Sequence, residues 1–196
     1  QYFNANTPAD QTLWAKAVKD AATLKKLGAT AVWFPPATKG AAGKDDRGYA
    51  PYDLYDLGEF NQKGSVGTRY GTKKEYLEAI DAMKAQGINV YADIAVRQKL
   101  GADSVEKVTA ADFNAKDIPQ MIGNKKIVGA LSKFTFPGRK SKYSKFKWNW
   151  NHFAGIDWQQ DDFKRRVCEL SGMTETEAEK KYKLSKYDYI IGRELD

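Results

Sequence analysis

The chain has 196 residues and a formal net charge of +7, which arises from 32 basic and 25 acidic residues. Its 42% apolar and 13% aromatic content is typical of a globular protein and excludes a fully disordered chain. The single cysteine, Cys168, excludes an intrachain disulfide framework and a cysteine-rich zinc site. The longest apolar runs fall short of the roughly 18 residues of a membrane helix, and the first residues do not resemble a signal peptide. We therefore expect no membrane partner.

The basic charge leaves a nucleic-acid or anionic-surface partner open, with residues 139–147 as the candidate basic patch. A solvated loop whose lysines face water is the commoner interpretation of such a stretch. We therefore expect no nucleic-acid partner.

A first helix-then-strand unit is predicted near the start of the chain. Residues 7–27 predict a helix, because Thr7 can cap it, Pro8 suits its first position and apolar residues recur at spacings of three and four. Gly28 ends this helix. The apolar run 29–34, closed by two prolines, predicts a strand buried on both faces.

The same order returns in a second unit. Thr72 and Glu75 form a capping-box pattern at the start of a helix that Gly87 ends. Residues 88–96 then predict a second buried strand, and residues 1–3 are a candidate for another. Helices that alternate with buried strands predict a parallel α/β sheet, either open or closed into a barrel.

The regular pattern ends after Val96. Residues 97–196 are rich in aromatic and turn-forming residues and predict an irregular, β-rich excursion, with one helical stretch at 163–183. Loops at the carboxyl ends of parallel strands commonly build binding surfaces. An eight-stranded barrel takes about 250 residues, so this chain would form only part of one.

The segment from Gly48 to Val66, GYAPYDLYDLGEFNQKGSV, closely resembles the bacterial liquefying-type α-amylases of glycoside hydrolase family 13. Further segments resemble that family in the same order: AVWFPP at 31–36, TRYGT at 68–72, FTFPGR at 134–139 and YSKFKW at 143–148. The resemblance covers most of residues 1–158 and returns at 187–189. It implies a partial (β/α)8 TIM barrel whose first three strands lie in residues 1–96, with a protruding B domain at 97–196.

The resemblance also implies an activity and a partner. Members of the family hydrolyse α-1,4-glucosidic bonds with retention, which requires one carboxylate nucleophile and one carboxyl acid/base. By resemblance these groups come from later strands, so we expect no catalytic residue in this chain and no activity of the chain alone. The implied partner is an α-glucan or maltooligosaccharide, with a second fragment that completes the barrel left open. The compartment also stays open, with a secreted or periplasmic location favoured.

The resemblance assigns Tyr49 and Gln98 to substrate binding, and Asp93 and Arg97 to structural positions near the site. Tyr49 matches the family tyrosine that stacks on the sugar next to the scissile bond. Asp93 matches the aspartate at the end of the third strand. Arg97 stands in place of a metal-binding asparagine, and Gln98 in place of a sugar-binding histidine.

The family's calcium site is expected to be lost. Asp188 and Asp196 match acidic ligand positions, and Glu194 stands where an aspartate is expected. A guanidinium supplies no oxygen ligand, so Arg97 cannot bind calcium, and Ala154 replaces a further aspartate. We expect no cofactor, with Arg97 lying among the three acids in place of the metal. The alternative is an Arg97 side chain that points to solvent.

Two functions remain open from the sequence. In the first, the chain is part of a starch-acting hydrolase and contributes substrate subsites and scaffold. In the second, it belongs to a non-catalytic relative, a pseudoenzyme that binds α-glucan or has a structural role. His152 is expected to be structural. The aromatic residues of 148–158 are expected to form a core rather than a sugar platform; they are Trp148, Trp150, Phe153 and Trp158.

Overall fold

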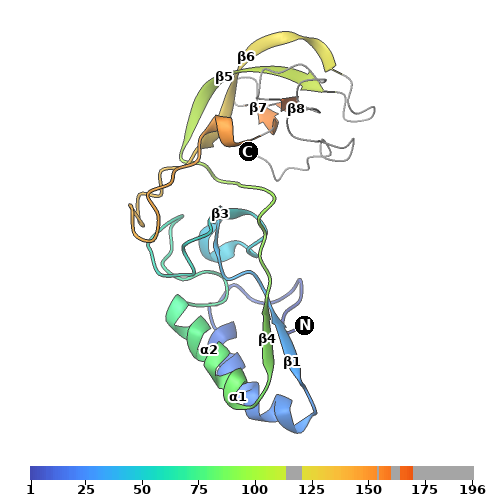
Figure 1. Cartoon of the computed structure of the whole chain (residues 1–196), viewed down its shortest axis with the longest axis vertical. Helices are drawn as coiled ribbons and strands as arrows, with labels where there is room; N and C mark the ends of the chain where they lie inside the picture. The colour runs from blue at the N-terminus through green and yellow to red at the C-terminus, as the bar shows by residue number, and fades with distance from the viewer. Residues whose placement is uncertain (114–120, 154, 160–163, 170–196) are drawn as a thin grey trace. The chain divides into compact units, whose positions relative to one another are not determined.

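The computed structural model describes residues 1–113, 121–153, 155–159 and 164–169 (Figure 1). The chain divides into two compact units. The first contains residues 1–97 and 136–145, and the second contains the described residues of 98–135 and those from 146 onward. The segment 136–145 therefore packs with the first unit. The predicted domain boundary at residue 97 stays a prediction.

The first helix, α1, spans Leu13–Lys26 and begins later than predicted. Thr12, rather than Thr7, occupies the position before its first turn. The Thr7 hydroxyl accepts a hydrogen bond from the Asn4 backbone N–H at 2.9 Å, and its carbonyl accepts two from the Arg69 guanidinium at 2.9 and 2.6 Å. These contacts hold the residues before α1 outside the helix.

The second helix, α2, spans Lys73–Ala85 and begins as predicted. Thr72 Oγ1 accepts from the Glu75 backbone N–H at 3.4 Å, and Glu75 Oε2 accepts from the Thr72 N–H at 2.8 Å. This reciprocal pair satisfies two backbone donors that a helix start otherwise leaves unpaired. The predicted capping box is confirmed.

Two strands, β1 (Ala31–Phe34) and β4 (Asn89–Ala92), pair in parallel, with Val32 opposite Val90. The predicted parallel pairing is confirmed, but β4 ends at Ala92, well before residue 96. Residues 1–3 are not a strand. The Tyr2 N–H nevertheless donates to the Trp33 carbonyl at 3.0 Å, so this segment lies beside β1.

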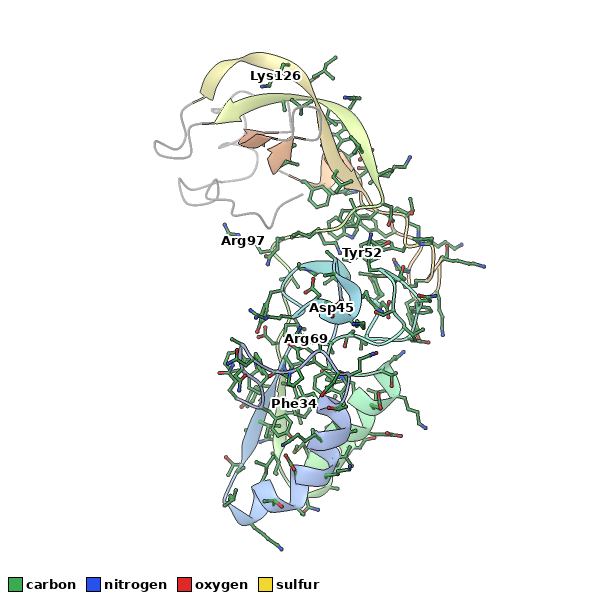
Figure 2. The ribbon with its side chains drawn as sticks, turned by 180° about the vertical axis from the view of Figure 1, so that it is seen from behind. Phe34, Asp45, Tyr52, Arg69, Arg97 and Lys126 are labelled. Atoms are coloured by element: carbon green, nitrogen blue, oxygen red, sulfur yellow. The ribbon has the colours of Figure 1, made fainter. Side chains whose placement is uncertain are left out.

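The two helices lie side by side against one face of the β1–β4 pair (Figure 1). Phe34 is fully buried in the core between strands and helices, where it contacts Trp14 with ring centroids 5.2 Å apart (Figure 2). On the other face Trp33 is 43% exposed and Tyr91 64% exposed. The expected burial on both faces is not found in this chain by itself, because helices cover a single face in the part of the chain described here.

A short antiparallel pair follows β1 in the first unit. It consists of β2 (Lys39–Gly40) and β3 (Pro51–Asp53), and the connection between them includes the 3-10 turn η1 (Gly43–Asp45). The residues between these strands carry Tyr49.

The second unit contains a four-stranded antiparallel sheet in the order β6-β5-β8-β7. Its strands are β5 (Ser104–Phe113), β6 (Met121–Lys133), β7 (Gly155–Gln159) and β8 (Lys164–Glu169), and the 3-10 turn η2 spans Trp150–His152. The helix predicted at 163–183 is wrong over residues 164–169, which pair with β5 and β7 as a strand. Residues 170–183 lie outside the described residues. Neither described helix is long and apolar enough to cross a membrane.

Candidate sugar-binding site

Tyr49 and Asp93 meet at the carboxyl end of the β1–β4 pair. Asp93 directly follows β4, and its N–H donates to the carbonyl of Phe34, the last residue of β1, at 3.2 Å. The Tyr49 hydroxyl donates to Asp93 Oδ2 at 2.6 Å. In barrels and open α/β sheets, sites form at this end of parallel strands. The structure thus brings together two of the four residues that the sequence assigned to the site or its surroundings.

The backbone before Tyr49 approaches the end of β1 closely. Gly48 has φ +91°, and a Cβ atom placed on it would lie 2.6 Å from Pro36 Cβ and 2.7 Å from the Pro36 carbonyl oxygen. Only glycine fits there. The Gly48 N–H donates to Asp46 Oδ1 at 2.7 Å, and Tyr70 donates to the Arg47 carbonyl at 3.0 Å. Tyr49 is therefore presented from a firmly held loop.

The Tyr49 ring is 39% exposed while its hydroxyl is engaged by the carboxylate. Burial raises the pKa of the Tyr49 phenol, and the hydrogen bond to Asp93 and the charge of that residue raise it further. The phenol therefore stays protonated and remains the donor near neutral pH. A carboxylate accepts several hydrogen bonds, so Asp93 has acceptor capacity for a sugar hydroxyl beside an aromatic surface.

The structure describes two of the remaining predicted site residues, Arg97 and Gln98. Arg97 is exposed and belongs to the first unit, whereas Gln98 is half-buried and belongs to the second. Three acidic residues of the calcium proposal, Asp188, Glu194 and Asp196, lie outside the described residues, as does Ala154. Within the described ranges, no group of three or more His, Cys, Asp or Glu residues is placed to hold a metal ion. The replacement of calcium by Arg97 stays a prediction.

A buried polar network was missed by the sequence analysis. Arg139, which the sequence placed in a solvated basic patch, is only 2% exposed. It donates to Asp53 Oδ2 at 2.6 Å, and Gln62 Nε2 donates at 3.0 Å to both Asp53 Oδ2 and Asp56 Oδ2. The signal available in the sequence was the pair of acids in the 52–56 segment, which need partners if that apolar run is buried. The solvated-loop interpretation is wrong for Arg139.

The aromatic residues of the second unit pack on one another. Trp148 stacks on the buried Phe153 with centroids 5.7 Å apart, and the His152 ring lies edge-on to Trp148 at 5.7 Å. Trp150 lies more exposed, at 37%. The side chain of Trp158 lies outside the described residues. The prediction of a core holds for Phe153. His152 has a structural role, since its Nδ1 also accepts a hydrogen bond from the Asn149 N–H at 3.1 Å.

A parallel α/β unit with polar and aromatic side chains at its carboxyl edge is common to TIM barrels and open α/β sheets. No family model matches the chain. Curated relatives do match over its whole length. The chain is 46% identical over 197 residues to an α-amylase of Geobacillus stearothermophilus, of which it covers 36%. It is 41% identical over 198 residues to the glucan 1,4-alpha-maltohexaosidase of Bacillus sp. (strain 707), of which it covers 38%.

More distant proteins are similar as well. The cytoplasmic α-amylase of Escherichia coli (strain K12) is 36% identical over 200 residues, with 40% of that protein covered. Among solved structures, an alternansucrase in complex with isomaltotriose matches 70% of this chain and 13% of its own, with a TM-score of 0.52 and 25% identity. The chain belongs to the α-amylase family, glycoside hydrolase family 13. It spans well under half the length of the curated relatives it matches.

Proposed function

We propose that this chain is the N-terminal part of an α-amylase-like glycoside hydrolase that acts on α-1,4-glucans such as starch and maltooligosaccharides. In this proposal the chain contributes substrate subsites and scaffold, and later parts of the protein supply the catalytic carboxylates. The observation that carries the proposal is the Tyr49 hydroxyl bonded to Asp93 at 2.6 Å at the carboxyl edge of the parallel strands. The names of the relatives, α-amylase and maltohexaosidase, supply the substrate class.

The pair suits a sugar for two reasons. The face of a glucose ring carries C–H groups that pack on an aromatic surface, which the half-exposed Tyr49 ring offers. The hydroxyls at the ring edge need acceptors when they leave water, and Asp93 supplies a charged one. Asp93 also fixes the orientation of the Tyr49 ring through their hydrogen bond.

The exposed face of the β1–β4 pair supports the partial-barrel part of the proposal. Trp33 and Tyr91 lie opposite each other in the register, and both are substantially exposed. Large apolar side chains in register on an uncovered sheet face normally pack against further structure. Since the relatives are two to three times longer than this chain, later strands of the same protein or a second fragment would cover this face.

A non-catalytic relative that binds α-glucan is the second candidate. It is favoured by the resemblance, by which Arg97 and Gln98 stand in place of a metal-binding asparagine and a sugar-binding histidine. We keep the proposal that Arg97 takes the place of calcium among Asp188, Glu194 and Asp196, which would leave the protein without a metal cofactor.

The two candidates are separated by one pair of assays on the full natural protein. Binding of maltoheptaose is measured by isothermal titration, and release of reducing sugar is measured on the same samples. Binding with hydrolysis supports the hydrolase. Binding without hydrolysis supports the non-catalytic relative, and absence of both contradicts the proposal that the chain contributes glucan subsites.

A further inference from the structure

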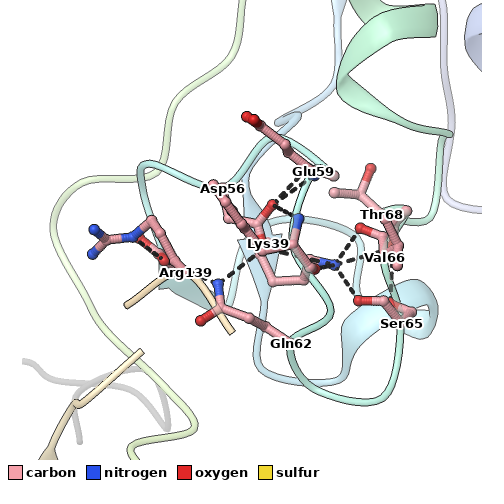
Figure 3. Close-up of polar contacts among 12 residues, drawn as sticks. Lys39, Asp56, Glu59, Gln62, Ser65, Val66, Thr68 and Arg139 are labelled. Carbon is pink, nitrogen blue, oxygen red and sulfur yellow. Dashed lines mark hydrogen bonds and ion pairs between the residues drawn. The ribbon is translucent and has the colours of Figure 1, made fainter. Parts of the chain in front are cut away.

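Lys39 is a fully buried cation on β2, with 0% of its side chain exposed. Its ammonium group lies among backbone carbonyl oxygens of one turn (Figure 3). Nζ donates to the carbonyls of Ser65 at 2.7 Å and Val66 at 2.6 Å. It lies 3.3 Å from the carbonyls of Phe60 and Gly67. Four uncharged oxygens therefore converge on one positive charge.

A carboxylate completes the group. Asp56 Oδ2 lies 3.8 Å from Lys39 Nζ, and the Asp56 side chain is also fully buried. Asp56 is held in place from its other side, because its Oδ1 accepts from the N–H groups of Gly58 at 2.9 Å and Glu59 at 2.8 Å. Its single negative charge balances the charge of Lys39. Burial lowers the pKa of Lys39, and the charge of Asp56 opposes that change.

The oxygens outnumber the hydrogen atoms that Lys39 can donate. An ammonium group has three N–H donors, whereas four carbonyls and one carboxylate surround it. Proteins use such rings of backbone carbonyls to replace the hydration shell of a monovalent cation. The arrangement therefore has the ligands of a cation site, with a covalently tethered cation inside it.

The chain reverses direction within this turn at residues 62–65. The Gln62 N–H donates to the Ser65 carbonyl at 3.1 Å and the Ser65 N–H donates to the Gln62 carbonyl at 3.2 Å. Lys63 and Gly64 between them have φ +50° and +78°, in the left-handed region. The Ser65 carbonyl lies at the end of this reversal, and a positive charge among it and the neighbouring carbonyls offsets the repulsion between oxygens of like partial charge.

We propose that residues 60–67 and Asp56 form a monovalent-cation site that Lys39 fills with its own ammonium group, and that truncation of Lys39 opens this site to a free primary ammonium ion. Lys39 then acts as a permanently bound cation that orders the turn. This inference concerns the turn and not the sugar site, so it stands or falls independently of the proposed glucan function.

The test uses the full natural protein with Lys39→Ala, melted in the presence of methylammonium or ethylammonium and, separately, tetramethylammonium. A free ion that binds only the folded state raises the melting temperature in a saturable way. We expect a rise of about 1–2 °C at ten times the dissociation constant with the primary ammonium ions, because the entropy of unfolding grows with the length of the protein. Tetramethylammonium has the same charge but no N–H and a larger volume, so we expect no saturable rise with it.

Two matched controls, in which the site stays filled, separate binding at the site from general salt effects. Wild-type protein keeps Lys39 in the site, and Lys39→Met fills the same space with an uncharged chain. Primary ammonium ions should change the melting temperature of neither protein by more than the effect of ionic strength. An equal response in wild type and Lys39→Ala, or no response of Lys39→Ala to any of these ions, would overturn the proposal. If Lys39→Ala does not fold in plain buffer, its refolding yield is compared in the same salts. A refolding yield that none of these salts increases would also overturn the proposal.

A second measurement needs no variant. The nitrogen-15 resonance of Lys39 Nζ in the wild-type protein distinguishes a charged ammonium from a neutral amine. The proposal requires a charged group with slowly exchanging protons near neutral pH, because a neutral amine would turn its lone pair toward surrounding oxygens. A neutral Lys39 amine would overturn it.

Discussion

The Arg139 guanidinium donates to the Asp53 carboxylate at 2.6 Å and joins two parts of the first unit that are 86 residues apart in the chain. Both side chains are buried. Arg139 also donates to the carbonyls of Lys142 and Ser144 at 2.7 and 2.8 Å, so one side chain shapes its own loop as well. This contact explains why the segment 136–145 packs with the first unit.

Arg139→Met is expected to destabilise the protein by about 3–5 kcal/mol, because it leaves Asp53 as a buried charge without its cationic partner. The free energy of unfolding by denaturant measures this loss. Lys140→Met, an exposed position one residue away, is the matched control and should cost less than about 0.5 kcal/mol. Equal losses at the two positions would show that the buried ion pair does not hold this segment.

Glu59 is predicted to make stability depend on acid pH. Hydrogen bonds from Lys142, Lys73 and Tyr143 lower the pKa of Glu59 from 4.5 to about 2. A carboxyl whose pKa is lower in the folded state stabilises that state above its unfolded pKa, and the contribution is lost as the pH falls through the folded pKa. The stabilisation should therefore be complete above about pH 4.5 and lost progressively toward pH 2.

The measurement compares the melting temperature of wild type and Glu59→Gln across this pH range. The two curves should converge at the acid end and separate above pH 4.5. Added salt should reduce the separation, because the group is partly exposed and screened. A separation that stays constant with pH would contradict the assignment of the effect to the Glu59 charge.

Gly48→Ala is expected to be more damaging than Gly28→Ala. Both glycines have positive φ, but a Cβ at Gly48 would collide with Pro36, whereas a Cβ at Gly28 meets nothing within 4 Å. Gly28→Ala should cost about 1 kcal/mol from backbone strain alone. Gly48→Ala should cost more and should also weaken maltoheptaose binding by moving Tyr49. Equal unfolding free energies and unchanged binding would contradict the tight placement of this loop.

Thr72→Ala is expected to cost about 1 kcal/mol, since it removes one half of the capping box of α2. Thr12→Ala at the start of α1 is the matched control, because Thr12 makes no side-chain bond to that helix. The Thr12 hydroxyl donates instead to the exposed Asp10 carboxylate at 2.8 Å, so the variant should cost no more than about 0.5 kcal/mol, as is usual for a surface substitution. Denaturant unfolding of both variants measures the difference, and a larger loss for Thr12→Ala would be contrary to the observed caps.

Local signals in the sequence predicted the elements that depend on local contacts. The Thr72 and Glu75 pattern set the start of α2, and the two apolar runs predicted the parallel pairing of β1 with β4. The start of α1 was missed because Arg69, distant in sequence, bonds to the Thr7 carbonyl and holds that segment out of the helix. No local pattern reports such a contact.

In the candidate site, too, the sequence predicted some features and only the structure shows the others. Tyr49 and Asp93 were assigned by resemblance, and the structure adds their hydrogen bond and the role of Gly48. The burial of Arg139 and Lys39 was not predicted, because a charged residue in a loop normally faces water. Each is buried because distant acids and carbonyls pair with it, and that depends on the folded arrangement of residues far apart in the chain.

The central claim is that Tyr49, held by Asp93, forms part of an α-glucan subsite, and the most direct test is titration of maltoheptaose into Tyr49→Ala and Tyr49→Phe in the full natural protein. Tyr49→Ala removes the stacking ring and should weaken binding about ten-fold. Tyr49→Phe keeps the ring and should lose less, while Tyr55→Phe, a half-exposed tyrosine elsewhere in the first unit, should bind as wild type. Unchanged affinity in Tyr49→Ala would contradict the account.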